Sequence, residues 1–278
     1  RGVPDDKGPS LAALYAVKSL LDDGIQFTKR IRFIFGTDEE TLWRCMNRYN
    51  QIEEQADLGF APDSSFPLTY AEKGLLQVKL HGPGWDDLPL QAGQALNVVP
   101  DKATYAGHRL EELLPVLDQS GVQYSQTEDS VTVLGVSKHS KDAAEGVNAI
   151  VGLAESLSLI QPHPALLFIA DAVGEDATGG ALFGRITDEP SGDLSFNLAT
   201  LVIDQEQSEI GIDIRIPVLA DKDVLVARLQ EIAASYQLEY EEFDYLAPLY
   251  VPLDSPLVSS LMAVYQEETG DRTPAMSS

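Results

Sequence analysis

The sequence predicts an α/β fold in which a parallel-sheet domain receives an inserted α+β domain made of two similar halves. Two observations predict it. Short apolar runs alternate with amphipathic helices over the first 63 residues, which is typical of a parallel sheet covered by helices. From about residue 74 the pattern changes, and a strand, a proline, a helix and a further strand follow one another twice. We therefore expect one domain at 1–73 and 247–278 and the inserted domain at 74–246.

The first domain opens with a helix over residues 9–23. Pro9 and Ser10 suit its start, Gly24 can end it, and its apolar side chains fall on one stripe. The other elements expected here are strands at 31–35 and 57–63 and helices at 40–49 and 254–271.

The inserted domain begins with a strand at 75–84. Its two halves have strands at 95–100 and 209–217 that end in Pro100 and Pro217, and the match between them predicts a structural duplication. Between the halves we expect helices at 145–160 and 163–173 and a turned, glycine-rich loop at 173–194.

Composition excludes several classes of protein. With 44% hydrophobic and 23% charged residues, the chain of 278 residues is globular rather than disordered. Its net charge of −25 argues against binding to nucleic acid or to an anionic membrane surface. A single cysteine, Cys45, permits no intrachain disulfide and fits the reducing cytoplasm. The chain starts and stops within motifs, so we expect it to be a piece of a longer protein.

Carboxylates lie next to the predicted elements of the first domain at three places. Asp5 lies just before the first helix, Glu39 and Glu40 follow the run at 31–35, and Asp63 follows the run at 57–63. The carboxyl ends of parallel strands meet at one edge of a sheet, where ligands bind. Such carboxylates would repel one another unless a cation lay between them. The pattern therefore predicts a divalent metal site, although solvated acidic turns and a dipole-favoured helix start are the alternatives.

Six short motifs, in order along the whole chain, resemble those of one family. It is the di-metal aminopeptidase/carboxypeptidase superfamily that contains carboxypeptidase G, aminoacylase and the bacterial dipeptidase PepV, and the doubled insertion resembles the PepV-like branch. The motifs are GVPDDKG (2–8), GTDEET (36–41), FAPDSSFP with AEKG (60–74), ALNVVPD (95–101), GVSKHSKDAAEGVNA (135–149) and DIRIP (213–217).

The resemblance implies roles for the acidic residues. Asp5 would bridge two divalent metal ions, most often zinc with manganese or cobalt as alternatives, and its bond to Asp6 would be cis. Glu40 and Asp63 would each bind one metal, and Glu39 would be the general base. The first domain would then be part of the catalytic domain, and the insertion its lid. The family's upstream His-x-Asp and its late histidine are missing, which leaves three of five ligands and predicts that this piece alone is inactive.

Three residues of the insertion also match the family. His139 would stabilise the oxyanion that develops on the substrate, Asn97 would contact the substrate near its reacting carbonyl or amino group, and Arg215 would grip its terminal carboxylate. A strand-end cap is the alternative for Asn97, and a structural salt bridge is the alternative for Arg215.

The function that this resemblance implies is a dipeptidase that hydrolyses unblocked dipeptides with a metal-activated water. The doubled lid favours short substrates and a monomer. Two alternatives stay open. The same scaffold serves N-acyl amino acid deacylases and desuccinylases, and the chain could also be a catalytically incomplete piece, a folded lid with part of a metal site.

Overall fold

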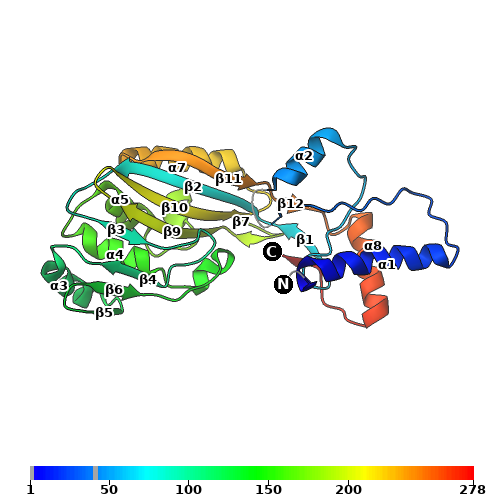
Figure 1. The fold of residues 1–278 in the computed structure, drawn as a ribbon, viewed down its shortest axis with the longest axis horizontal. Coiled ribbons are helices and arrows are strands. Elements are labelled where there is room, and N and C mark those ends of the chain that lie inside the picture. The colour runs from blue at the N-terminus through cyan, green and yellow to red at the C-terminus, as the bar shows by residue number, and fades with distance from the viewer. Residues whose placement is uncertain (1–2, 40–42) are drawn as a thin grey trace. The chain divides into compact units, whose positions relative to one another are not determined.

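The computed structural model describes residues 3–39 and 43–278. The chain forms two compact units (Figure 1). The first unit comprises Arg1–Tyr70 with Val251–Met276, and the second comprises Ala71–Tyr250 with Ser277–Ser278. That these units act as a catalytic domain and a lid stays a prediction.

The first unit is built mainly from helices. The α1 and α8 helices confirm the expected ones, and Gly270 ends α8 with a positive φ of 73°, where glycine carries no steric penalty. The α2 helix begins at Arg44, and the expected start of this helix at 40–42 lies outside the described residues. The elements are the turn η1 (Val3–Lys7), α1 (Gly8–Asp22), α2 (Arg44–Ile52) and α8 (Pro256–Thr269).

The strands expected at 31–35 and 57–63 are wrong, because both segments are irregular in the structure. A strand is held by hydrogen bonds to a neighbouring strand, and these segments have no such neighbour among residues 3–39 and 43–278. The expected parallel sheet built on these runs is likewise absent from the described residues. Almost all strand pairs there run antiparallel. The exception is the C-terminal segment, which runs parallel to 71–73, because the N–H of Ser278 donates to the carbonyl of Ala71 and the N–H of Lys73 donates to the carbonyl of Ser278. Many apolar side chains of this unit are exposed, among them Leu11, Tyr15, Phe35, Phe60 and Phe66.

A small sheet in the order β12-β1-β13 contains the three points where the chain passes from one unit to the other. Its strands are β1 (Thr69–Glu72), β12 (Leu249–Tyr250) and β13 (Met276–Ser277).

The second unit is centred on a five-stranded antiparallel sheet in the order β11-β2-β10-β9-β3 (Figure 1). The β2 and β10 strands confirm the strands expected at 75–84 and 209–217. The strands are β2 (Gly74–Pro83), β3 (Leu90–Ala92), β9 (Ser195–Ile203), β10 (Gln207–Ile216) and β11 (Glu239–Leu246).

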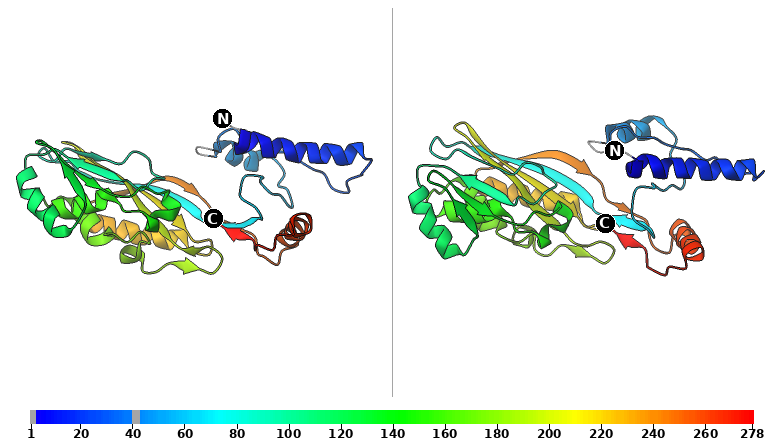
Figure 2. Two further views of the ribbon diagram at one scale, coloured as in Figure 1. Left: turned by 90° about the horizontal axis from the view of Figure 1, so that it is seen from below. Right: turned by 60° about the horizontal axis from the view of Figure 1, so that its bottom comes forward.

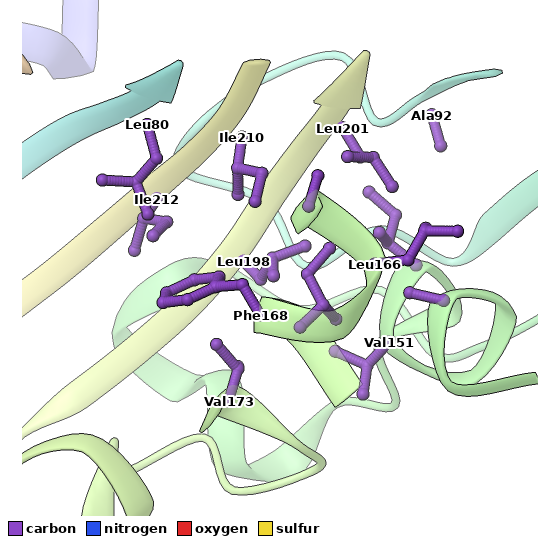
Figure 3. Close-up of a cluster of buried hydrophobic side chains, with 14 of the residues drawn as sticks. Leu80, Ala92, Val151, Leu166, Phe168, Val173, Leu198, Leu201, Ile210 and Ile212 are labelled. Atoms are coloured by element: carbon purple, nitrogen blue, oxygen red, sulfur yellow. The ribbon is translucent and has the colours of Figure 1, made fainter. Parts of the chain in front are cut away.

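The two faces of this sheet differ in polarity. On one face alternate residues such as Leu80, Ile210 and Ile212 are buried in the hydrophobic core, where they surround Phe168 (Figure 3). The other face carries polar residues. Gln77 and Asn197 lie directly opposite Asp213 in the register, so these three side chains share that face. The helices α4, α5 and α7 cover only the apolar face (Figure 2), which leaves the polar face for binding or for loops.

Four helices of this unit, η2, α4, α5 and α7, begin at side chains that accept backbone hydrogen bonds. Asn148 caps α4 by accepting from Ile150 and Val151, and Asp221 caps α7 by accepting from Asp223 and Val224. The helices are α3 (Leu110–Ser120), η2 (Ser140–Glu145), α4 (Ala149–Ser158), α5 (Pro164–Leu167), η3 (Phe168–Val173), α6 (Gly180–Phe183) and α7 (Lys222–Ser235). The glycine-rich loop contains α6 and the short hairpin of β7 (Thr187–Asp188) and β8 (Gly192–Asp193).

A second sheet in the order β4-β6-β5 belongs to the first half of the insertion. The strand expected to end at Pro100 is wrong, since only an isolated bridge joins Val98 to His139 there. The two halves thus have sheets of different size, and a duplication stays a prediction. The strands are β4 (Lys102–Tyr105), β5 (Tyr124–Gln126) and β6 (Val131–Leu134).

No helix within the described part of the chain is long and apolar enough to cross a membrane.

We expect Phe168→Ala to destabilise the second unit by about 3–5 kcal/mol, since it removes a wholly buried ring and leaves a cavity. Denaturant unfolding followed by circular dichroism measures this change. Leu159→Ala is the control, because Leu159 is 75% exposed and its truncation should change stability by no more than about 0.5 kcal/mol. Equal effects of the two changes would contradict the core as described.

Candidate functional site

Three carboxylates of the first unit come close enough to influence one another. The side chain of Asp63 is exposed, yet its pKa is raised above the ordinary value of 3.8. Desolvation by the surrounding protein is the largest cause, and the negative charges of Asp6 and then Asp5 add to it. Asp63 therefore lies within electrostatic reach of the Asp5–Asp6 pair, and a metal shared by Asp5 and Asp63 stays a prediction.

The Asp5–Asp6 turn has the features expected of a cation-binding loop. Its peptide bond is cis, as the family resemblance implied. Oδ2 of Asp6 accepts a hydrogen bond of 3.1 Å from the Ser10 hydroxyl, while its buried Oδ1 has no hydrogen-bond partner among the described residues. Oxygen donors that repel one another suit a divalent cation, so the residues present fit a metal.

The described residues do not by themselves form a complete metal site. Within residues 3–39 and 43–278 no group of three or more His, Cys, Asp or Glu side chains is arranged to hold an ion. The predicted ligand Glu40 lies outside the described residues. Convergence of Asp5, Glu40 and Asp63 on one site therefore stays a prediction.

Asp38 organises the loop that carries Glu39. Its carboxylate accepts hydrogen bonds from the backbone N–H groups of Arg44 (3.0 Å) and Cys45 (2.9 Å) at the start of α2. The hydrogen bond from the Cys45 side chain, followed by that from its backbone, lowers the pKa of Asp38 to about 2. Asp38 thus fills the helix-start role that was the alternative for this acidic run, and Glu39 lies exposed beside it.

The three predicted residues of the insertion come together in the second unit. Val98, next to Asn97, forms an antiparallel bridge with His139. The backbone N–H of Ser140 donates to the carbonyl of Asn97 at 2.9 Å, and Nη2 of Arg215 donates to Oγ of Ser140 at 3.2 Å. Segments that are far apart in the sequence therefore meet at one end of the polar face of the sheet.

Arg215 is held from beneath by a buried carboxylate. Its Nε donates to Oδ1 of Asp213 at 2.9 Å, and Oδ2 of Asp213 accepts from Nε2 of Gln77 at 2.9 Å. Asp213 is wholly buried, and the Arg215 side chain is 20% exposed. The structural salt bridge that was the alternative for Arg215 is present, and the arginine still reaches solvent.

His139 is poised as a neutral hydrogen-bond donor. Its pKa is lowered from 6.5, first by burial and then by the charges of Arg215 and Lys141. The backbone N–H of Lys141 donates to Nδ1 at 3.2 Å, so the proton of the neutral ring lies on Nε2. Nε2 has no partner among the described residues, which leaves its N–H for a ligand.

Sequence reasoning missed four polar residues that hold this cluster together. Their roles depend on strand register and tertiary contacts. Only Asp213 could have been found from the sequence, because it lies two residues before Arg215 on one strand and so shares its face. The four residues are Ser140, Ser195, Asn197 and Asp213.

Comparison with known proteins identifies the family. The description "Peptidase family M20/M25/M40" matches the chain over residues 1–278. The chain belongs to this family. The match confirms the resemblance that the six motifs indicate.

Three curated members of the M20 family give the range of similarity. The Bacillus subtilis (strain 168) protein named "Putative dipeptidase YtjP" is 34% identical over 100% of this chain and 64% of its own length. "Putative dipeptidase MW1694" of Staphylococcus aureus (strain MW2) is 33% identical over 98% of this chain and 64% of its own length. "Putative dipeptidase SH1171" of Staphylococcus haemolyticus (strain JCSC1435) is 31% identical over 98% and 63%.

The M20 chain thus spans slightly less than two thirds of the length of these relatives. None of the matches bears out the expectation that the chain alone is inactive. Among solved structures, an aminoacylhistidine dipeptidase from Vibrio alginolyticus aligns with a TM-score of 0.38 and 11% identity, over 75% of this chain and 51% of that one.

The proximity of Asp63 to Asp6 can be tested by titration, without an assay of enzymatic activity. In metal-free M20 chain, Asp6→Asn should lower the pKa of Asp63, measured by NMR titration of its side-chain carbon, because it removes a neighbouring negative charge. Asp57→Asn is the matched control, since Asp57 does not contribute to that shift. The raised folded-state pKa favours folding below pH 3.8, and this contribution is lost as pH rises through the folded value. If the pKa of Asp63 is unchanged in Asp6→Asn, the two carboxylates do not lie close enough to interact.

The charge of Arg215 lowers the pKa of His139 after burial does, and this influence can be tested by a second titration. Arg215→Gln should raise the pKa of His139 toward 6.5 in NMR titrations of the ring, since it removes a positive charge that disfavours the imidazolium. Arg228→Gln should leave that pKa unchanged, because Arg228 pairs with Glu231 instead. Protonation of His139 disfavours the folded state, so stability should fall as pH drops from 6.5 through the folded pKa.

Proposed function

We propose that the protein is a metal-dependent dipeptidase that hydrolyses unblocked dipeptides. Membership of the M20 family and the names of the curated relatives support this class of reaction. The observation that carries it is the grouping of Asn97, His139 and Arg215, which supplies a polar contact, a neutral donor and a cation in one cluster.

Asp5, Glu40 and Asp63 would hold two divalent ions, with Asp5 shared between them. A bound metal pair lowers the pKa of a water molecule and polarises the scissile carbonyl. Zinc is the ion we expect, with manganese or cobalt as alternatives, because all three accept carboxylate and imidazole ligands. Desolvation, followed by repulsion from Asp6 and Asp5, raises the pKa of Asp63 in the metal-free chain, and attraction to the ions would offset both effects.

Glu39 would act as the general base. It would take a proton from the attacking water and deliver it to the nitrogen of the leaving amine. Asp38, anchored to the start of α2, would keep the adjacent Glu39 in place without competing for the proton, since its own pKa is about 2.

The residues of the second unit would bind the dipeptide. The Nε2–H of neutral His139 would donate to the oxygen that becomes negative as water adds to the carbonyl. Asn97 would donate to or accept from the groups beside that carbonyl. Arg215 would pair with the terminal carboxylate, which distinguishes a dipeptide from an internal peptide segment.

The remaining features follow from the same proposal. The second unit would act as a lid of two α+β halves at 74–246, and the catalytic domain would comprise 1–73 and 247–278. A lid that covers short substrates within one chain suits a monomer. With Cys45 unpaired, the protein would work in the cytoplasm.

Glu39→Gln in the full-length protein tests the mechanism. It should leave the metal content unchanged and lower kcat for a dipeptide by about 10²–10⁴-fold, because the amide cannot accept the proton. Steady-state kinetics with metal analysis of the same sample measures both. Glu53→Gln, an exposed change at the end of α2, should be neutral. Normal turnover in the Glu39 variant would remove this residue from the mechanism.

The substrates offered in that experiment decide between the proposed activity and its nearest alternative. Free dipeptides should be cleaved, and N-acetyl and N-succinyl amino acids should not. Preferred cleavage of the acylated compounds would make the protein a deacylase, and cleavage of neither class would overturn the proposed function.

A further inference from the structure

Ser140 makes hydrogen bonds to three separate segments of the second unit. Its backbone N–H donates to the carbonyl of Asn97 at 2.9 Å, and its Oγ accepts from Nη2 of Arg215 at 3.2 Å. Its carbonyl accepts a hydrogen bond of 2.5 Å from the hydroxyl of Ser195. Ser140 also follows His139 directly, so one residue connects all three members of the proposed substrate-binding cluster.

The position of Ser140 depends on the register of the sheet. Ser195 on β9 lies directly opposite Arg215 on β10, so their side chains share the polar face. Both bond to Ser140, which is wholly buried above them. Two adjacent strands (Figure 1) therefore form a fixed base to which the His139 segment is attached.

A second side chain on the same face holds Asn97. The amide nitrogen of Asn197 donates at 3.0 Å to the carbonyl of Leu96 and at 3.0 Å to that of Val98. Asn197 is 1% exposed and lies beside Asp213 in the register. The backbone on both sides of Asn97 is thereby tied to the sheet that carries Arg215.

The guanidinium of Arg215 is constrained at two of its three nitrogens. Nε is bonded to buried Asp213 and Nη2 to Ser140, whereas Nη1 has no partner among the residues that the structure describes. Because the guanidinium is planar, these two contacts fix the direction in which the Nη1 hydrogens point. A planar carboxylate would meet a donor that is already oriented.

We propose that Ser140 is a positioning residue whose hydroxyl, together with the Asp213 carboxylate, orients Arg215 toward the terminal carboxylate of the substrate. Its backbone holds His139 and Asn97 in the same frame. This inference rests on the proposed dipeptidase function. A side chain that is already oriented loses less conformational entropy when it binds a ligand. The hydroxyl of Ser140 therefore increases the preference of the site for substrates with a free carboxylate.

The test is Ser140→Ala in the full-length, metal-loaded protein. We measure kcat/KM for a free dipeptide and for the same dipeptide with an amidated C-terminus, which lacks the charge that Arg215 binds. The ratio of the two values should fall about tenfold, because a hydrogen bond to a charged group is lost. A purely structural defect would lower both values together. Ser156→Ala is the matched control, because this buried serine donates only within α4.

A second readout keeps the inference separate from the proposed function. NMR signals of the Arg215 guanidinium report rotation about its Nε–Cζ bond, which should be slow in the wild type and in Ser156→Ala and faster in Ser140→Ala. If no dipeptide is cleaved, the proposed function fails and this readout decides on the positioning role alone. An unchanged selectivity ratio overturns the proposal when dipeptides are cleaved, and unchanged Arg215 rotation overturns it when they are not.

Discussion

The buried carboxylate of Asp213 is the constraint on which the polar half of the second unit depends. It is wholly buried and is paired with Arg215 and Gln77, each at 2.9 Å. An unpaired charge at this place would carry a large desolvation penalty, so the two strands that supply these residues, β2 and β10, must keep their register. The loops around Asn97 and His139 attach to that register, and their geometry is a consequence of it.

The first unit follows the opposite electrostatic logic. Among residues 3–39 and 43–278, no Lys or Arg contributes to the pKa of Asp63, which is instead raised by desolvation and by two further carboxylates. An orphaned buried oxygen on Asp6 adds to the imbalance. In the second unit the compensating cation is part of the chain, whereas under the proposed function the first unit would take it from solution. In a chain with a net charge of −25, such an ion would reduce the repulsion among these carboxylates, while the rest of the surface would stay acidic.

Elements with local signals could be predicted from the sequence. The α8 helix has its serine cap, early proline and terminal glycine in the sequence itself, and β2 has alternating apolar residues. The runs at 31–35 and 57–63 look as strand-like, but a strand exists only through its neighbours. The motifs likewise pointed to Asn97, His139 and Arg215, whereas Ser140 and Asn197 act through tertiary contacts that no local pattern encodes.

The choice of arginine at position 215 follows from the contacts around it. A lysine has one charged group, and a salt bridge to Asp213 would use it for the interior of the protein. The guanidinium has five N–H donors in a fixed fork, so Nε can neutralise the buried carboxylate while the far side of the same cation faces outward. Under the proposed function, stability and anion binding would depend on different edges of one group. In so acidic a protein, this arrangement would keep a positive charge where the anionic end of a substrate would meet it.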